Sequence, residues 1–239
     1  MRDALPKRGL KAGWAQLCSE NIPCPRSYFP EKFRGEIWGH CLDHSIDGTP
    51  YFQDVEPTVN ALNQAFSQSG SFQAQIHTLL QVLAGDMPVA VLRDQTHRPF
   101  MAGTIRSFPT HGYIPPHCDR EQLGREESKP VVDLIDARSV LSYSLLIQRP
   151  SHKGRLLLHD LRWDDSGTNY LGESGRTDVT SIVSERRYFP IELDCGDLVL
   201  FASGRIFHSL EPIEGEIPRV NYCGFVAKTP QSDSVVYWT

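Results

Sequence analysis

Three side chains in this sequence could together hold a metal ion: His117, Asp119 and His208. His117 and Asp119 stand in the triplet His-Cys-Asp, and His208 follows Asp119 by 89 residues. Two imidazoles and one carboxylate can occupy one face of an iron(II) ion, which leaves positions open for a cosubstrate and for oxygen. Arg219 lies 11 residues beyond His208, and a guanidinium group is suited to bidentate binding of a carboxylate. The spacing therefore predicts a metal site with a dicarboxylate beside it.

The triplet alone is weak evidence for a metal site, because short motifs often occur by chance. The residues around it strengthen that evidence. Residues 103–108 have the pattern of a β-strand and precede the triplet, and Pro115 and Pro116 stiffen the approach to His117. Residues 198–201 are a second strand-like run shortly before His208. Strands that end beside the candidate ligands would fix their directions.

The composition limits the classes of partner. Lys and Arg number 24 against 29 Asp and Glu, giving a net charge of -5 without a dense basic run, so nucleic acid is not expected as a partner. No apolar stretch has membrane-spanning length, and the first residues lack the apolar core of a signal peptide. The six cysteines form no CxxC pair, which favours reduced thiols and a cytoplasmic location. A small-molecule substrate fits this composition, whereas the oligomeric state stays open.

The two parts of the chain differ in pattern. The first hundred residues have helix-like apolar spacing, and a short strand is expected at 88–92. The helix-like segments are 31–38, 55–69 and 71–83. Short strand-like runs separated by Gly, Pro and Asp follow at 103–108, 140–148, 155–159, 187–191, 198–201 and 220–227. They indicate an antiparallel sandwich or barrel, with a long loop at 162–176. We expect a single domain over 1–239, with a mainly helical flank at 1–100 and a β core at 101–230.

Two stretches resemble the 2-oxoglutarate/iron(II)-dependent dioxygenases, and in particular their prolyl 4-hydroxylase-like branch. The stretch from Arg106 to Asp119 is similar to the family's iron-binding segment. The stretch Gly196-Asp197-Leu198-Val199-Leu200-Phe201, continued to His208 and Arg219-Val220-Asn221, is similar to its second half-motif. Residues 100–163 also resemble hydroxylases related to the amino-acid halogenases. The resemblance covers roughly residues 103–227.

The resemblance implies an α+β fold, mainly β, with a double-stranded β-helix (jelly-roll) core and a helical N-terminal region. It implies that His117, Asp119 and His208 bind iron(II) and that Arg219 binds the distal carboxylate of 2-oxoglutarate. O2 would be the other cosubstrate, with ascorbate as a stimulant. Phe108 stands where this branch often has a cosubstrate-binding tyrosine, and Asn221 where it often has Ser or Thr. Tyr143, Ser142 or Asn221 could take over those contacts.

Asp119 also bears on the type of reaction. In the related amino-acid and alkaloid halogenases a small residue replaces the carboxylate, which leaves room for chloride on iron. Asp119 fills that position, so the sequence favours hydroxylation of an unactivated C–H bond of a small metabolite, such as an amino acid or a biosynthetic intermediate. Two alternatives remain: the same chemistry on a protein or peptide side chain, and a non-oxidative, cupin-like metal-binding protein. Arg219 has a clear role only if a dicarboxylate binds.

Three further residues are candidates for substrate binding. Arg106 lies on the strand that enters the site and could point inward to an anionic group or outward to water. His111 lies on the loop before the ligands and either contacts the substrate or has no role. Trp163 opens the long loop, where it either closes over the substrate or lies in an exposed turn. Cys118 should point away from the metal, because it alternates with its neighbours along the chain.

Overall fold

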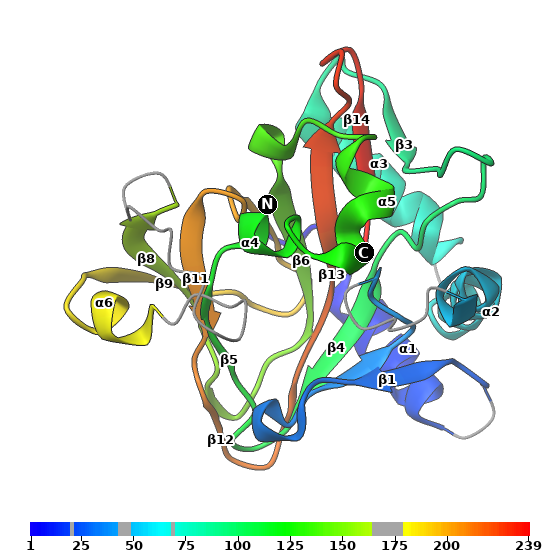
Figure 1. Cartoon of the computed structure of the whole chain (residues 1–239). Coiled ribbons are helices and arrows are strands. Elements are labelled where there is room, and N and C mark those ends of the chain that lie inside the picture. Colours follow the sequence, from blue (N-terminus) through cyan, green and yellow to red (C-terminus); the bar gives the residue numbers. More distant parts are fainter. Residues whose placement is uncertain (20–21, 43–48, 68–69, 164–178) are drawn as a thin grey trace.

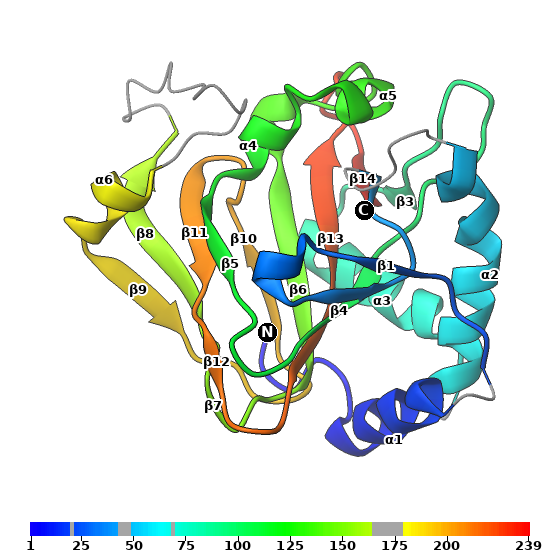
Figure 2. The ribbon, with the colours of Figure 1, turned by 60° about the horizontal axis from the view of Figure 1, so that its bottom comes forward.

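The computed structural model describes residues 1–19, 22–42, 49–67, 70–163 and 179–239. Two mainly antiparallel sheets face one another in it, and the helices of the first hundred residues lie on the far side of the larger sheet (Figures 1 and 2). The predicted class, mainly β with flanking helices around a jelly-roll core, is confirmed. No helix among the described residues is both long and apolar enough to span a membrane.

The larger sheet has eight strands, and β13 is its centre. β13 pairs with β4 and β14 along one edge and with β6 along the other, and β10 extends the sheet beyond β6. The strands are β1 (Arg26–Tyr28), β2 (Glu36–Trp38), β3 (Val89–Val91), β4 (Thr104–Phe108), β6 (Leu141–Gln148), β10 (Leu198–Phe201), β13 (Arg219–Lys228) and β14 (Val235–Trp238).

The smaller sheet has four strands in the order β5-β11-β8-β9. These are β5 (Ile114–His117), β8 (Leu156–Arg162), β9 (Tyr188–Ile191) and β11 (Ile206–Leu210). A short antiparallel pair, β7 (His152–Lys153) with β12 (Ile213–Glu214), lies at one end of the barrel. The short helices α4 (Asp119–Gln122), α5 (Lys129–Val132) and α6 (Thr180–Ser184) lie near the other end (Figure 2).

Helices α1 (Lys7–Cys18), α2 (Thr49–Ala65) and α3 (Phe72–Ala84) cover the outer face of the larger sheet. In α3 the buried residues Phe72, Ile76 and Leu80 recur every four positions, so they share one face of the helix. The hydroxyl of Ser71 accepts a hydrogen bond from the backbone N–H of Ala74 and caps the first turn. α3 agrees with the predicted helical segment 71–83, and β3 agrees with the predicted strand. α2 overlaps the predicted segment 55–69 but begins and ends earlier in the chain.

Residues 31–38 are not the predicted helix. They form a 3-10 turn at Glu31–Phe33 and the strand β2. Pro30 precedes the turn, and Arg34 ends it in the left-handed conformation at φ 52°, which breaks any helix there. Pairing of β2 with β4 then supplies the backbone hydrogen bonds that a helix would have made. Tertiary pairing therefore overrides the helical spacing of these few residues.

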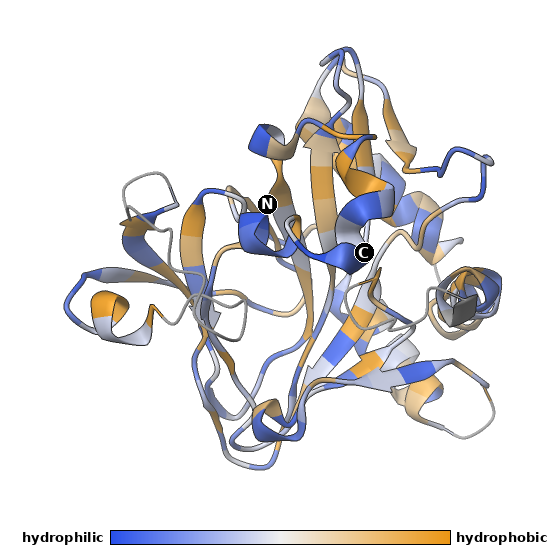
Figure 3. Cartoon of the chain, in the orientation of Figure 1, coloured by the Kyte–Doolittle hydropathy of each residue, from blue (hydrophilic) through white to orange (hydrophobic). Residues whose placement is uncertain are grey.

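The two faces of the larger sheet differ in character because side chains alternate along each strand. Along β6, Tyr143, Leu145 and Ile147 belong to the hydrophobic core beneath the helices. Ser142 and Ser144 alternate with them and point into the barrel, where both line a cavity. In Figure 3 the upper part of β13 and the strand β14 are largely hydrophobic, whereas the connections near β12 are largely hydrophilic. The polar inner face of this sheet is therefore available for chemistry.

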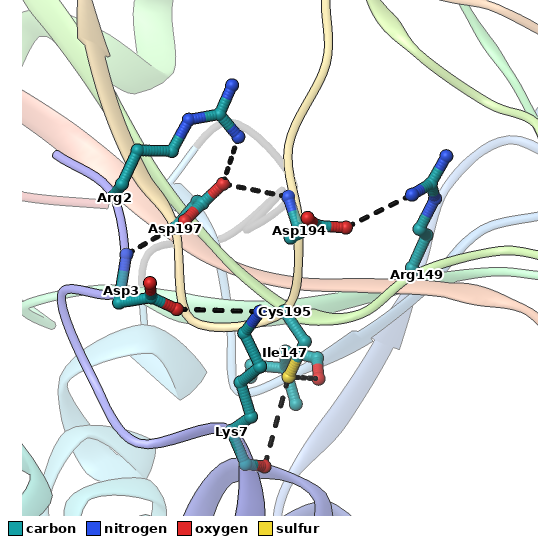
Figure 4. Close-up of polar contacts among 8 residues, drawn as sticks. All are labelled: Arg2, Asp3, Lys7, Ile147, Arg149, Asp194, Cys195 and Asp197. Carbon is teal, nitrogen blue, oxygen red and sulfur yellow. Dashed lines mark hydrogen bonds and ion pairs between the residues drawn. The ribbon is translucent and has the colours of Figure 1, made fainter.

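The N-terminal residues attach to the turn before β10 through Asp197 (Figure 4). The Asp197 carboxylate, 2% exposed, pairs with Arg2. It also accepts hydrogen bonds from the backbone N–H of Asp3 at 2.9 Å and of Asp194 at 2.8 Å. Burial alone would raise the pKa of Asp197, but these hydrogen bonds and the Arg2 charge lower it. The carboxylate thus joins the first residues to the barrel.

We expect Asp197→Ala to lower the free energy of unfolding by about 1–3 kcal/mol, because it removes a buried carboxylate that accepts three part-buried hydrogen bonds. The difference from the unmutated protein should be full above about pH 4, the ordinary aspartate pKa, and should shrink as the pH falls through the lowered pKa of the folded state. Urea unfolding at several pH values measures both. Asp194→Asn is the control, since its carboxylate is 53% exposed and pairs with Arg149 at the surface. An equal loss of unfolding free energy in both variants would contradict the stabilising role assigned to the Asp197 carboxylate.

Candidate metal centre

His117, Asp119 and His208 meet at one point between the two sheets. β5 and β11 pair so that His208 lies opposite His117, and their ring centroids are 4.2 Å apart. Asp119 begins α4 directly after β5, and its Oδ1 lies 3.5 Å from Nε2 of His117 and 3.8 Å from Nε2 of His208. One ligand atom from each residue lies within 4.8 Å of the others. The three donor atoms are therefore close enough to bind one ion.

Hydrogen bonds set the tautomers that a metal requires. Nδ1 of His117 lies 2.9 Å from the carbonyl oxygen of Pro115, and Nδ1 of His208 lies 3.1 Å from that of Ile206. A carbonyl can only accept, so each Nδ1 carries the proton and each Nε2 presents a lone pair. Burial and the facing His208 lower the pKa of His117 to about 4, which keeps the ring neutral near pH 7. Both rings are thus prepared as metal ligands.

Asp119 supplies the negative charge of the centre. The residue is 4% exposed. Burial alone would raise the pKa of Asp119, but the facing His208 and His117 and a hydrogen bond from Ser142 lower it. The hydroxyl of Ser142 donates to Oδ2 at 2.6 Å, which leaves Oδ1 directed to the two imidazoles. Two neutral imidazoles and one carboxylate fit the donor set of a non-haem iron(II) site.

We expect Ser142→Ala to weaken iron(II) binding about 10- to 100-fold, because the hydroxyl that orients Asp119 is lost. An anaerobic titration with iron(II), followed by competition with a chelator, measures the dissociation constant. Ser142→Thr keeps the hydroxyl and should retain most of the affinity. If both variants bind iron(II) as the unmutated protein does, the hydrogen bond has no orienting role.

A cavity extends from the three ligands along the inner face of the larger sheet. Serines, an asparagine and two arginines share its wall with apolar side chains. Its lining comprises Arg106, Phe108, Ile114, His117, Asp119, Ser142, Tyr143, Ser144, Leu156, Phe201, His208, Ser209, Leu210, Arg219, Asn221, Cys223, Gly224 and Phe225. A few polar groups among apolar side chains are typical of the lining of a small-ligand site.

Arg219 lies at the start of β13 and is 5% exposed. One guanidinium nitrogen donates to the carbonyl oxygen of Gly154 at 3.0 Å. Among the described residues, no carboxylate forms an ion pair with Arg219. Burial lowers its pKa to about 10, so the group stays charged at neutral pH. Burying a cation without an anion costs free energy. Because Arg219 lies in the cavity wall, a ligand with a carboxylate could supply that anion.

Asn221 and Tyr143, the other two predicted cosubstrate contacts, differ in direction. Asn221 points into the cavity, and its amide donates to the hydroxyl of Ser144 at 3.1 Å. Tyr143 contributes to the cavity wall, but its hydroxyl donates to the carbonyl oxygen of Ala102 at 2.5 Å within the hydrophobic core. Strand alternation places that hydroxyl on the side of the helices. Asn221 is therefore the better placed of the two.

The structure places the three predicted substrate-binding residues in different surroundings. Arg106 lines the metal cavity. His111 is exposed, in the left-handed conformation at φ 66°, and is not part of the lining. Trp163 stacks on Phe207 at 6.2 Å between ring centroids, in an apolar cluster outside the cavity. Most of the predicted loop 162–176 lies outside the described residues. Of the three, only Arg106 lies beside the metal ligands.

Several lining residues were not singled out in the sequence, notably Ser144, Phe201, Cys223 and Phe225. Phe201 packs edge-on against His208, with 4.9 Å between ring centroids. Ser144, Cys223 and Phe225 share the inner face of β6 and β13 with residues that were identified. The sequence alone does not give the register of these strands, and this register decides that the three residues share the inner face. Cys118 is fully buried in the apolar cluster with Phe207, as predicted, and does not face the metal ligands.

A family model described as carrier-protein-independent halogenase WelO5 matches residues 1–239. The chain therefore belongs to this family, within the iron(II)/2-oxoglutarate-dependent oxygenases, and the predicted superfamily is confirmed. No curated protein matches the sequence.

Three solved structures share the fold. An N-substituted L-amino acid dioxygenase from Burkholderia ambifaria AMMD aligns with a TM-score of 0.62 at 17% identity, covering 99% of this chain and 84% of that one. The epimerase SnoN from nogalamycin biosynthesis aligns at 0.51 and 11% identity, covering 94% and 74%. HygX from Streptomyces hygroscopicus, with nickel and 2-oxoglutarate bound, aligns at 0.51 and 10% identity, covering 94% and 80%. At these identities the likeness concerns the fold.

Proposed function

We propose that this protein is an iron(II)- and 2-oxoglutarate-dependent hydroxylase of a small molecule. The observation that carries the proposal is the pair Asp119 and Arg219. Asp119 completes a ligand set for iron(II), and Arg219 is a buried cation in the wall of the same cavity. A non-oxidative metal-binding protein would need Asp119 but would have no use for Arg219.

The chain's own groups have distinct tasks in this reaction. His117, Asp119 and His208 hold the ion, and Ser142 directs one carboxylate oxygen toward it. Arg219 binds the distal carboxylate of 2-oxoglutarate and so orients the cosubstrate. When bound, iron(II) and 2-oxoglutarate supply the oxidising chemistry of this class with O2. Phe108, Phe201 and Phe225 line the cavity with apolar surface and limit the access of water.

Asp119 supports hydroxylation, although the matching family model carries the name of a halogenase. When bound, iron(II) would be held by His117, Asp119 and His208, and its remaining positions would be open to 2-oxoglutarate and oxygen. An ionised Asp119 beside both imidazoles would occupy the position that a halide would need, which favours hydroxylation over halogenation.

The lining of the cavity supports a small-molecule substrate. Apolar side chains such as Phe201 and Phe225 lie beside polar groups such as Ser144 and Asn221 near the metal ligands, and this mixture is typical of a small-ligand site. An amino acid or a biosynthetic intermediate is the proposed substrate. A solved structure of the same fold is an N-substituted L-amino acid dioxygenase, which agrees with this class of substrate.

The proposal is tested by succinate formation from 2-oxoglutarate. Purified protein with iron(II), ascorbate and O2 should form succinate, and a true substrate should increase the rate. Asp119→Ala should abolish succinate formation, whereas Asp194→Asn, on the barrel surface, should not change it. If the folded, iron-loaded protein neither binds nor consumes 2-oxoglutarate, the proposed function is wrong.

A further inference from the structure

The inner face of the smaller sheet carries a row of four side chains that begins at the metal ligands. His208 of β11 lies directly opposite His117 of β5 on one side and Leu158 of β8 on the other. Leu158 in turn lies opposite Phe189 of β9, which is the outer strand of this sheet (Figure 2). Residues directly opposite one another share a face of the sheet. Leu158 and Phe189 therefore lie on the same face as the two imidazoles.

This row leads from the metal ligands to the surface. Neighbouring strands are about 4.8 Å apart, so Phe189, two strands away from His208, lies roughly 10 Å from it along the row. Phe189 is 60% exposed, and Leu158 is half-buried. Neither side chain belongs to an apolar cluster of the described residues. Exposed apolar surface that continues from a binding site is typical of a ligand-binding groove.

The outer face of the same sheet has apolar partners within the chain. Side chains alternate along a strand, so Tyr188 lies on the outer face, where its ring is 6.3 Å from that of His159 between centroids. On the same face Leu161 packs in one apolar cluster with Val183 of α6. The inner row has no such cluster among the described residues beyond the metal ligands. Its apolar end is therefore the part of this sheet that is open to a ligand.

The cosubstrate would use a different part of the inner face. Leu156 and Arg219 both line the metal cavity, and Arg219 donates to the carbonyl oxygen of Gly154 at 3.0 Å. The distal carboxylate of 2-oxoglutarate at Arg219 would therefore lie toward the start of β8. Leu158 lies two residues further along β8 than Leu156, beyond the cavity lining. The row from Leu158 to Phe189 is thus left to another ligand.

We propose that Leu158 and Phe189 bind an apolar group of the substrate, so that the substrate is a small amphipathic molecule. The apolar group extends along the row toward β9. The polar part faces the inner wall of the larger sheet, where Ser144 and Asn221 line the cavity. The carbon that is oxidised lies between the two parts, beside the metal ligands. This inference rests on the proposed function and names the substrate class of the same site.

The experiment uses the full-length, iron-loaded protein and N-acyl derivatives of L-alanine with acetyl, butanoyl, hexanoyl and octanoyl groups. These probes share one polar part and differ only in the length of the apolar chain. Substrate-stimulated succinate formation gives the KM for each probe, and an anaerobic titration gives the dissociation constant of 2-oxoglutarate. Phe189→Ser removes the aromatic ring at the end of the row, and Phe189→Leu keeps an apolar side chain there. Tyr188→Ser is the matched control, because Tyr188 is the preceding residue, is 51% exposed and lies on the outer face.

In the unmutated protein the KM should fall along the series, by up to about fourfold for each methylene group that the row buries. Phe189→Ser should keep the KM of N-acetyl-L-alanine but lose the gain that the octanoyl chain gives. Phe189→Leu should recover part of that gain, and Tyr188→Ser should behave as the unmutated protein. The dissociation constant of 2-oxoglutarate should be the same in all variants.

A KM that does not depend on chain length in the unmutated protein, an equal loss in Phe189→Ser and Tyr188→Ser, or no stimulation by any probe would overturn the proposal. Sedimentation of each variant tests whether Phe189 lies between two copies of this chain instead. A change from oligomer to monomer in Phe189→Ser would assign the side chain to that contact and overturn the proposal as well. If the unmutated protein binds no 2-oxoglutarate at all, the proposed function fails, and this inference fails with it.

Discussion

His208→Ala should lose tight iron(II) binding and all measurable turnover of 2-oxoglutarate. The substitution removes one of three ligands, and we expect the dissociation constant for iron(II) to rise by more than the roughly 100-fold that loss of a supporting hydrogen bond costs. The remaining pair, His117 and Asp119, cannot hold three positions on one face of the ion. Anaerobic metal titration and the succinate assay measure the two effects.

His159→Gln is the matched control for this variant. His159 is also buried and lies on β8, with Nε2 2.9 Å from the hydroxyl of Ser209. It does not line the metal cavity. Iron binding should therefore be retained in His159→Gln. Loss of iron binding in both variants, with both folded, would mean that any buried histidine of the smaller sheet is needed, and the triad assignment would be contradicted.

Arg219→Gln should raise the dissociation constant of 2-oxoglutarate by about 30-fold to several thousandfold, because truncating one partner of a buried charge pair costs about 2–5 kcal/mol. Iron(II) binding should be unaffected, since Arg219 is not a ligand. Isothermal titration of 2-oxoglutarate into the metal-loaded protein gives the constant. This separates cosubstrate binding from metal binding.

Thermal unfolding gives an independent check, because substitution of Arg219 should stabilise the protein when 2-oxoglutarate is absent. Without 2-oxoglutarate, Arg219 is a buried cation with no carboxylate partner among the described residues, so Arg219→Met should unfold at a higher temperature than the unmutated protein. With 2-oxoglutarate at about 100 times its dissociation constant, the unmutated protein should gain about 2.7 kcal/mol and the variant should gain almost nothing. A variant that is still stabilised by 2-oxoglutarate would place the cosubstrate elsewhere.

The sequence predicted the metal ligands because their residue types carry the chemistry wherever the chain places them. His117, Asp119 and His208 could be named from type and order, and the strands around them from alternation and turn residues. The face on which a side chain lies could not be named in the same way. Tyr143 and Ser142 are neighbours on β6, and only the packing of α1–α3 against one side of the sheet decides that Ser142 faces the metal ligands.

The less successful predictions have the same cause. Residues 31–38 have helical spacing, but pairing of β2 with β4 determines their conformation. His111 precedes the ligands by only six residues, yet its backbone N–H donates to the carbonyl oxygen of Ile213 and its side chain is exposed. Contacts between distant segments decide both cases, and a local pattern does not contain them. The single-domain and cytoplasmic assignments stay predictions.

The most direct test of the account is an anaerobic spectroscopic titration of 2-oxoglutarate into the iron(II)-loaded protein, with and without chloride. We predict a visible charge-transfer absorption that requires both iron(II) and 2-oxoglutarate, is lost in Arg219→Gln at the same concentration, and does not change with chloride. Asp119→Gly, which opens a coordination position, should make the absorption sensitive to chloride. A chloride-dependent spectrum of the unmutated protein, or no absorption from folded and iron-loaded protein, would contradict a hydroxylase with Asp119 on the metal.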